Sequence, residues 1–399
     1  MKKILILGAG IYQVPLIKKA KELGYYAIVC SIKGDYPGFE IADKVYYVDT
    51  TDKYDCLDVA KKEAINAICT AGTDVALPTL GYINDSLHLK GPSEKSAVLS
   101  SNKLLMQEAF HDNGVNSARY FKVKSEKECI QCAKKIGFPC ILKVVDSSGS
   151  RGIQIVRDES ALIDAYNAIL PYTHKNYIIV EEYLEGEEFG AQAFVCEGRV
   201  LFVMPHSDEV YHGKTGVPIG HHVPFMHDNY EIISRRVYLE TEKAINALGI
   251  DNAAVNVDMI LVNDIPYILE IGARAGGTCL PELVALHYNI DYYKMIIEVA
   301  AGSLNINEYV FKPVQAATGL LITSQLSGVI KNYDINIKDD CIYDLSMDYK
   351  KGHHIRKFET GPDRIGQLIV YGNNAKRNCE RAFEILSEIR IDITPSSPL

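Results

Sequence analysis

Four short β-rich runs near the N-terminus, separated by amphipathic stretches with helical spacing, constrain the fold more than any other feature of this sequence. The runs are ILIL at 4–7, YAIVC at 26–30, VYYV at 45–48 and INAIC at 65–69. Strands that alternate with helices form βαβ units, in which the strands pair in parallel. A Gly-Pro-Ser sequence at 91–93 then interrupts the pattern. We therefore predict an N-terminal α/β domain with a parallel sheet over residues 1–95.

The turn after the first run contains Gly8-Ala9-Gly10, which is how a dinucleotide-binding motif begins. Such a motif continues with a third glycine, but position 13 is Gln, and the second run ends at Ser31 without the acid that binds a ribose. We interpret the segment as a tight strand-to-helix turn. The turn can still shape a substrate pocket, since helix N-termini attract carboxylates.

The region after residue 95 is predicted to be α+β with antiparallel strands, because strand and helix patterns alternate irregularly from 119 to 202 and strands are expected at 253–262 and 267–271. We place a second domain at 96–310, with a subdomain at about 118–186, and a C-terminal lobe at 311–399. Residues 205–228 are rich in Gly, His and Pro and are predicted to form a long loop, a kind of segment that often carries function.

Composition and charge restrict the kinds of partner. The chain of 399 residues has a net charge of −9, so it offers no excess of positive charge to a nucleic acid or an anionic membrane surface. No apolar stretch approaches the roughly 20 residues that a membrane helix needs. The ten cysteines lack zinc-site spacing, because Cys129 and Cys132 are the single close pair. These features predict small-molecule partners, no nucleic acid, no membrane, and a reducing cytoplasmic location.

Two acidic residues lie on the predicted hairpin 253–272, whose sequence is AAVNVDMILVNDIPYILEIG. If its loop has an odd number of residues, Asp258 lies directly opposite Glu270 on one sheet face, with Cβ atoms about 5 Å apart. Two unpaired carboxylates so placed destabilise a sheet, whereas a magnesium ion shared with nucleotide phosphates removes the repulsion. The alternative is a pair of solvated acids on an exposed face. The pair indicates magnesium together with a nucleotide.

Two lysines and a loop of small residues indicate where phosphates would bind. Lys143 lies inside the apolar run 140–145, where a buried ammonium requires an anionic partner. Lys103 lies in the first turn of a predicted helix, where the macrodipole disfavours a cation. A phosphate would suit both, although either lysine alone is more often a surface residue. Residues 146–152, DSSGSRG, form a loop whose amides can approach a phosphate, and no Walker motif occurs.

In their order along the chain these segments resemble the ATP-grasp superfamily, and the match covers nearly the whole sequence. The motifs that carry the resemblance are the lysines with their loop, IIVEEYLEGEEF at 178–189 and EIGARAGG at 270–277. The closest likeness is to carboxylate-amine ligases such as L-amino acid ligases, with similarity to biotin carboxylase and carbamoyl phosphate synthase. The resemblance implies an α/β (α+β) ATP-grasp fold with a Rossmann-like pre-grasp domain, a lid subdomain and a small C-terminal α/β lobe.

The resemblance also implies roles for residues. Asp258 and Glu270 match the pair that holds Mg²⁺, which Mn²⁺ can replace, and Arg274 matches the arginine that steadies an acyl phosphate. Arg274 and Lys143 are the expected catalytic residues. Many members carry Asn where this chain has Gly272, so a second metal ion would be held less tightly here or completed by water. The expected ATP contacts are Lys103, Lys143, Ser148, Gly149, Ser150, Gly152, Glu181, Glu182, Tyr183, Leu184 and Glu188.

Substrate contacts are expected around Arg274, whose planar fork can grip a carboxylate. The amides of Gly276 and Gly277 can bind a developing oxyanion before the next helix. His221 or His222 can orient an amine or accept its proton, and a solvated histidine is the equal alternative. A zinc site in 205–228 is not favoured, because adjacent histidines diverge on a strand and no cysteine or acid completes a set. Asp74, after the fourth run, is a candidate contact for a substrate ammonium.

The sequence therefore predicts an ATP-dependent ligase that joins an amino acid or similar carboxylate to an amine, through an acyl phosphate, with release of ADP and phosphate. One alternative is an enzyme that forms carbamoyl phosphate or carboxyphosphate. It is disfavoured because the chain lacks a duplicated half, a glutaminase segment and a Met-Lys-Met biotin site. Another alternative is a non-catalytic nucleotide-binding subunit, which the intact set of charged residues opposes. The first and last lobes are consistent with a homodimer.

Overall fold

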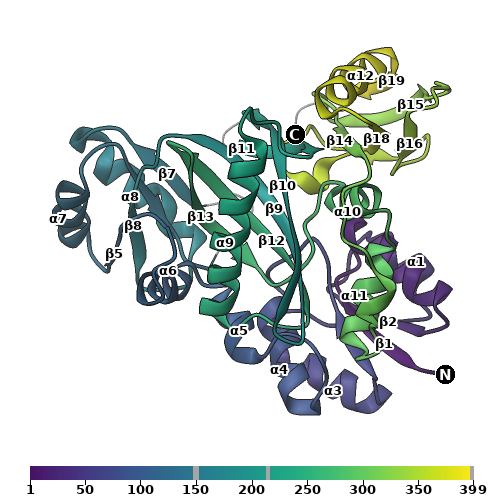
Figure 1. Cartoon of the computed structure of the whole chain (residues 1–399), viewed down its shortest axis with the longest axis horizontal. Helices are drawn as coiled ribbons and strands as arrows, with labels where there is room; N and C mark the ends of the chain where they lie inside the picture. The colour runs from purple at the N-terminus through teal and green to yellow at the C-terminus, as the bar shows by residue number, and fades with distance from the viewer. Residues whose placement is uncertain (147–151, 213–215, 396–399) are drawn as a thin grey trace.

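A computed structural model of the chain describes residues 1–146, 152–212 and 216–395. Figure 1 shows the first strands and helices at the lower right, helices α7 and α8 with their strands at the left, and α12 with the last strands at the upper right. Three of the expected ATP contacts, Ser148, Gly149 and Ser150, lie outside the described residues. Within the described ranges, no helix combines the length and apolar character that crossing a bilayer requires.

The N-terminal region contains a parallel four-stranded sheet in the order β3-β2-β1-β4, which confirms the predicted βαβ pattern. Alternate side chains of 4–7 pack against α1 on one face and against α3 on the other, so the whole run is buried. The strands are β1 Lys3–Leu7, β2 Tyr26–Ser31, β3 Lys44–Tyr47 and β4 Ala67–Cys69, and the helices are α1 Val14–Glu22, α2 Gly38–Ile41, α3 Lys53–Glu63, α4 Leu77–Leu87 and α5 Glu94–Leu99.

Gln13 explains why the first turn is not a dinucleotide site. Its Oε1 accepts from the Gly10 amide at 2.8 Å, and its Nε2 donates to the carbonyl of Ala71 at 2.5 Å. A Cβ on Gly8, which has a φ of +97°, would lie 2.9 Å from Gln13 Oε1. The glutamine side chain therefore covers the glycines whose amides a pyrophosphate would need.

A second, antiparallel sheet has the order β5-β8-β6-β7 and is covered by two helices. Helix α7 begins after Ser125, whose hydroxyl accepts from the Glu128 amide and caps the helix. The strands are β5 Tyr120–Val123, β6 Cys140–Lys143, β7 Ile153–Val156 and β8 Ile178–Glu182, the covering helices are α7 Glu126–Ile136 and α8 Leu162–Ile169, and α6 Lys103–Asp112 precedes the sheet.

The largest sheet has eight strands in the order β13-β12-β9-β10-β11-β14-β18-β16. The prediction of a loop at 205–228 is wrong. Strands β10 and β11, at the centre of this sheet, pair antiparallel through most of that segment. The pattern was hidden because polar His206, His221 and His222 occupy buried strand positions. The strands are β9 Glu187–Cys196, β10 Arg199–His212, β11 Gly216–Val223, β12 Ala253–Val262, β13 Ile265–Gly272, β14 Ala316–Ile322, β16 Ile342–Met347 and β18 Gly366–Gly372.

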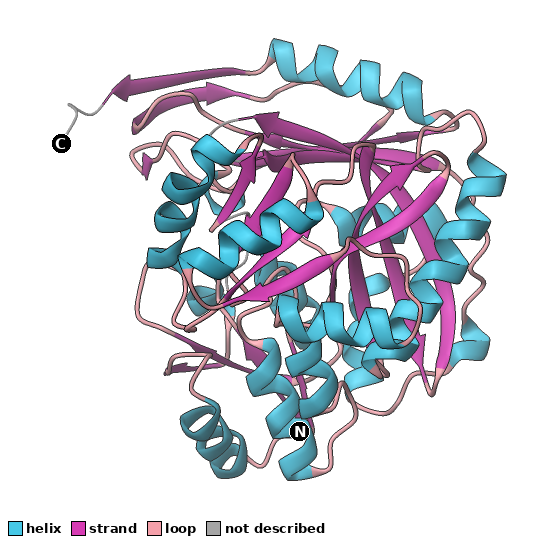
Figure 2. Ribbon diagram, turned by 90° about the vertical axis from the view of Figure 1, so that its left-hand side faces the viewer, coloured by secondary structure: helices cyan, strands magenta, loops and turns pink. Residues whose placement is uncertain are grey.

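This sheet continues from β11 into β14, across the boundary expected at 310, because residues 220–223 pair with 317–320. The domain limits at 95 and 310 stay predictions. A small sheet, β17-β15-β19, completes the C-terminal region, and in Figure 2 the long helix at the top leads into the strand that ends at the C-terminus. The remaining elements are α9 Tyr230–Leu248, α10 Leu280–Tyr288, α11 Tyr292–Ala300, α12 Ala375–Glu388, β15 Gly328–Asp334, β17 His354–Ile355 and β19 Arg390–Pro395.

Candidate active site

Asp258 and Glu270 lie directly opposite each other on β12 and β13, as the hairpin pattern predicted. The hairpin reaches this register without the expected loop of odd length. The turn contains only Asn263 and Asp264, both with positive φ, and a register shift after Asp258 leaves Leu269 as an extra residue. That bulge moves the carboxylates into register, so both side chains emerge on one face of the sheet.

The electrostatics of the pair favour the binding of a cation. Burial within the surrounding protein, and then the charge of Glu270, raise the pKa of Asp258 to about 7, and Arg274 opposes this only in part. Solvent still reaches the Asp258 side chain, so the carboxylate is not enclosed in a core. Two such oxygen ligands side by side, with excess negative charge, fit Mg²⁺ or Mn²⁺.

Lys103 and Lys143 share this acidic environment although they come from different elements. Lys103 Nζ donates to Glu270 Oε1 at 2.7 Å, and Lys143 Nζ lies 2.6 Å from Glu181 Oε2. Burial opposes the charge on Lys103, but Glu270, followed by Asp74 and Glu181, raises its pKa. Each lysine therefore has the anionic partner that its position requires, and here the partners are carboxylates.

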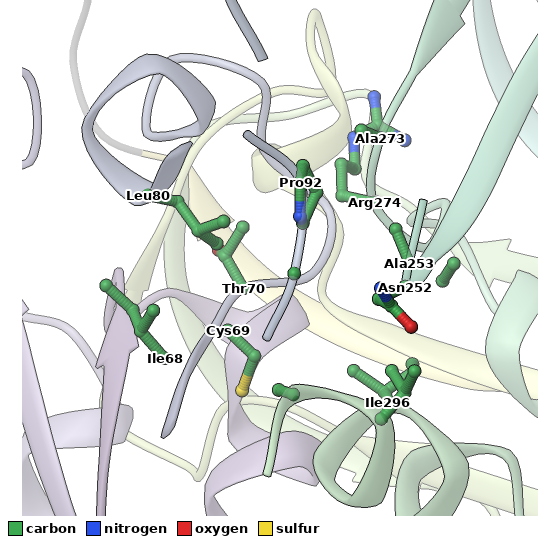
Figure 3. Close-up of a pocket in the computed structure, with 14 residues that line it drawn as sticks. Ile68, Cys69, Thr70, Leu80, Pro92, Asn252, Ala253, Ala273, Arg274 and Ile296 are labelled. Atoms are coloured by element: carbon green, nitrogen blue, oxygen red, sulfur yellow. The ribbon is translucent and has the colours of Figure 1, made fainter. Parts of the chain in front are cut away.

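Arg274 forms an ion pair with Asp74, which lies in the N-terminal region. Its Nε and Nη2 donate to the two oxygens of Asp74 at 2.8 and 2.7 Å, so Asp74 contacts the arginine. The charges of Asp74, Asp258 and Glu270 raise the pKa of Arg274 even though burial opposes them. The cavity of about 30 Å³ drawn in Figure 3, which Arg274 lines, holds only about one water molecule and is no substrate pocket.

The contact between Arg274 and Asp74 explains why position 272 is a glycine. A Cβ at that position would lie 2.7 Å from Asp74 Oδ1, so a side chain there would displace the partner of Arg274. An amide is instead supplied by Asn256, which lies opposite Gly272 in the ladder and donates from Nδ2 to Asp258 Oδ1 at 3.1 Å. The sequence signal for Asn256 was its place two residues before Asp258, on the same face of the strand.

Asn256 belongs to a buried amide network that sequence reasoning missed. Gln192 Nε2 donates to Asn256 Oδ1 at 2.6 Å, and Gln192 Oε1 accepts from the Gly276 amide at 3.0 Å. The Gly276 N–H is therefore occupied, which corrects its expected role as an oxyanion donor. Beyond Gly277, the residues Thr278 and Cys279 have positive φ values of 48° and 67°, and this strained backbone leads into α10.

The two predicted histidines lie on opposite faces of the sheet. His221 Nδ1 is 2.7 Å from Asp208 Oδ1, and His206 Nδ1 is 2.7 Å from the same oxygen. His206 pairs with Gly190 in register, and Gly190 pairs with Asp258, so this cluster shares the face of the carboxylate pair. His222 is fully buried on the other face, which corrects its assignment to the substrate.

These contacts also correct the statement that no acid or cysteine accompanies the histidines, because Asp208 bridges two of them. Asp208 was missed because the segment was expected to be a loop. Burial lowers the pKa of His221, partly offset by Asp208, so the ring is neutral at physiological pH.

The remaining expected ATP contacts occupy β8, β9 and the turn before β7. Glu181 is buried against Lys143, while Glu182 is held by Arg119 through bonds of 2.8 and 2.9 Å. Tyr183 and Leu184 follow β8 and are partly buried. Glu188 is exposed on β9 on the same face as Gly190, and Gly152 has a φ of +70° that favours glycine.

Comparisons with known proteins show what this chain is similar to. The sequence model of the ATP-grasp domain matches residues 100–278. The structure of a phosphoribosylglycinamide synthetase from Anaerococcus prevotii is 37% identical, covers 98% of this chain and 100% of its own, and superposes with a TM-score of 0.85. Dapdiamide A synthase from Enterobacter agglomerans is 25% identical over 301 residues, which are 70% of this chain and 69% of that protein. The L-amino acid ligase from Bacillus licheniformis shares the fold, with 18% identity, a TM-score of 0.82 and 99% coverage of both chains.

Proposed function

This chain belongs to the ATP-grasp family, and we propose that it is an ATP-dependent ligase that joins a carboxylate to an amine through an acyl phosphate. The observation that carries the proposal is the meeting of Asp258, Glu270, Lys103 and Arg274 above one sheet face. Such a concentration of opposite charges suits phosphoryl transfer, which needs positioning and charge neutralisation more than covalent catalysis.

The reaction has two steps. A carboxylate oxygen takes the γ-phosphoryl group of ATP, which gives an acyl phosphate and releases ADP. The amine nitrogen then attacks the acyl carbon, phosphate leaves, and the amine loses a proton. Asp258 and Glu270 would hold Mg²⁺ or Mn²⁺, which when bound neutralises charge on the ATP phosphates.

The lysines are proposed to exchange their carboxylate partners for phosphates when ATP binds. Lys103 and Lys143 are about nine-tenths buried, with side-chain exposures of 10% and 11%, so their ammonium groups are already positioned and largely desolvated. The pairs with Glu270 and Glu181 keep the lysines in place before the nucleotide arrives. Binding then costs little ordering of these long side chains.

Arg274 is the proposed ligand of the acyl phosphate. Asp74 takes two of its N–H donors, and Nη1 makes only a long bond of 3.4 Å to the Ala275 carbonyl. The edge of the guanidinium that carries Nη1 can therefore face a carboxylate or phosphate. Asp74 is accordingly a positioning residue for Arg274, in place of the direct ammonium contact that the sequence indicated.

His206 and His221 are the proposed proton acceptors for the amine. Because each ring directs Nδ1 at Asp208, a neutral ring that donates from Nδ1 keeps Nε2 as an acceptor. His206 Nε2 is buried and has no hydrogen-bond partner within the described ranges. The His206 ring occupies the space over Gly190, where a Cβ would lie 2.6 Å from Nε2. An amine substrate that reaches Nε2 would supply its missing partner.

The substrates proposed are an amino acid or similar small carboxylate and a primary amine. The names of the two relatives, a phosphoribosylglycinamide synthetase and a dapdiamide A synthase, both describe amides. The test is release of ADP and phosphate from ATP against a matrix of amino acids, other small acids, amines and bicarbonate. Stimulation by a carboxylate and amine together is expected, and AMP as the product would contradict the acyl-phosphate route.

Two variants sharpen that test. Glu270→Gln should abolish turnover, because it removes a metal ligand and the partner of Lys103. Glu187→Gln is the matched control, since Glu187 is exposed at the start of β9 and lies on the other face of that strand from Glu188. Full activity of Glu270→Gln would refute the site. Bicarbonate alone as the stimulating acid would favour carboxyphosphate chemistry, and no stimulation by any acid would favour a non-catalytic subunit.

Location and assembly are also proposed. A reducing cytoplasm is supported by ten free cysteines, seven of them buried. A homodimer is proposed from the resemblance of the first and last regions to family lobes, and light scattering after gel filtration tests it. A monomer mass would refute that assembly.

A further inference from the structure

A second cluster of ligand side chains lies on the sheet face opposite the candidate active site. Glu209 and His222 come from the hairpin β10–β11, and Cys379 comes from α12. Helix α12, at the upper right of Figure 1, packs on β14 and β18 and also contacts β11. His222 is fully buried, while Glu209 keeps 36% of its side chain exposed. The cluster therefore joins two regions that are far apart in the sequence and opens to solvent on one side.

The distances within the cluster match those of a tetrahedral metal site. His222 Nε2 is 3.0 Å from Glu209 Oε1 and 3.6 Å from Cys379 Sγ, and Sγ is 3.9 Å from the same Oε1. Zinc bonds of about 2.1 Å to nitrogen and oxygen and about 2.3 Å to sulfur place tetrahedral ligands about 3.4 Å apart for N–O, and about 3.6 Å apart for N–S and O–S. Shifts of about 0.4 Å or less would therefore complete the geometry.

A hydrogen-bond partner fixes the orientation of the His222 ring, as is usual for a histidine that binds a metal. His222 Nδ1 is 3.0 Å from Thr318 Oγ1 on β14, so the ring is fixed from behind with Nε2 directed at the cluster.

We propose that Glu209, His222 and Cys379 form a binding site for a divalent metal ion of the zinc class, with water as the fourth ligand, which fastens helix α12 to the hairpin β10–β11. The mixed sulfur, nitrogen and oxygen ligands select Zn²⁺ or Co²⁺ over Mg²⁺. The site is separate from the carboxylate pair, because His221 and His222 point to opposite faces of β11. Its role is structural, and it does not depend on the proposed ligase reaction.

Cobalt is the probe for this site, because a cysteine thiolate bound to Co²⁺ gives a sulfur-to-metal charge-transfer band in the near ultraviolet and tetrahedral Co²⁺ absorbs in the visible. Titration of the metal-free full chain with Co²⁺ should produce both bands, and the intensity of the sulfur band should saturate at one Co²⁺ per chain. Zn²⁺ added afterwards should displace Co²⁺ and remove both bands. Co²⁺ at Asp258 and Glu270, or at the cluster of His206, Asp208 and His221, gives no sulfur band, so those sites cannot imitate the result.

Three variants complete the test. Cys379→Ser should abolish the sulfur band, Glu209→Gln should keep it with affinity reduced by roughly tenfold or more, and the control Cys341→Ser, in the same C-terminal region, should leave it unchanged. Zinc at about 100 times its Kd should raise the Tm of the wild type by roughly 3–5 °C and leave that of Cys379→Ser unchanged. Absence of a sulfur band in the wild type, its persistence in Cys379→Ser or its loss in Cys341→Ser would overturn the proposal.

Discussion

Replacing Asp258 by Asn should stabilise the metal-free protein while abolishing its activity. The carboxylate faces Glu270 across the hairpin and is surrounded by protein, and together these raise its pKa from the ordinary 3.8 to about 7. An amide of the same shape carries no charge, so it removes the repulsion. It also removes one of the two proposed metal ligands. Stability and activity should therefore change in opposite directions, as is common where a functional site stores unfavourable charge.

The magnitude follows from the pKa difference. A rise of about 3 units corresponds to about 4 kcal/mol at most. Because solvent reaches the side chain of Asp258, screening reduces the expected gain to about 1–2 kcal/mol. A raised folded-state pKa makes the ionised acid destabilising. The gain should therefore be near zero below pH 4, grow between about pH 4 and pH 7 as the unfolded chain alone ionises, and stay constant above pH 7.

Urea unfolding of both proteins in EDTA, from pH 4 to pH 8.5, measures this effect. Asp264→Asn is the control, because Asp264 lies in the solvated turn of the same hairpin with 47% of its side chain exposed. Adding Mg²⁺ and a non-hydrolysable ATP analogue should reverse the order, since only the wild type keeps both metal ligands. A variant that is equally or less stable than wild type at pH 8 in EDTA, or a gain that does not change with pH, would refute the reasoning.

Three further predictions concern single contacts. Asp74→Asn should lower kcat/KM roughly 10- to 100-fold, because it loosens the partner that orients Arg274, and steady-state kinetics with an unchanged circular dichroism spectrum would check this. Gly272→Ala should have a similar kinetic effect, since its Cβ would lie 2.7 Å from Asp74 Oδ1, and wild-type kinetics would show that Asp74 can move away freely. Tyr292→Phe should leave stability unchanged or raise it by up to about 1 kcal/mol in thermal unfolding, because the buried hydroxyl has no hydrogen-bond partner among the described residues; a loss above about 1 kcal/mol would reveal a partner.

Local patterns account for most of the elements. The alternation of buried runs with amphipathic segments was enough to predict the parallel sheet of β1 to β4. The pairing of Asp258 with Glu270 was expected for an odd loop, whereas the structure reaches it through a two-residue turn and the bulge at Leu269. The prediction failed at β10 and β11. Histidines, glycines and prolines there lack the apolar alternation of a strand, although His206, His221 and His222 are buried by other parts of the chain.

Side-chain partners far apart in sequence were beyond any local pattern. Asp74 and Arg274 are 200 residues apart, and Lys103 and Glu270 are 167 apart, so only the packing of three regions shows that they pair. Gly272 was interpreted from the sequence as a missing ligand, while the structure shows it as the space that Asp74 occupies. The sequence by itself determined which charged groups exist and that Asp258 shares a strand face with Asn256, because alternation along a strand is local. The tertiary structure alone decided which opposite charges meet, because that depends on how the N-terminal region, the second sheet and the large sheet pack together.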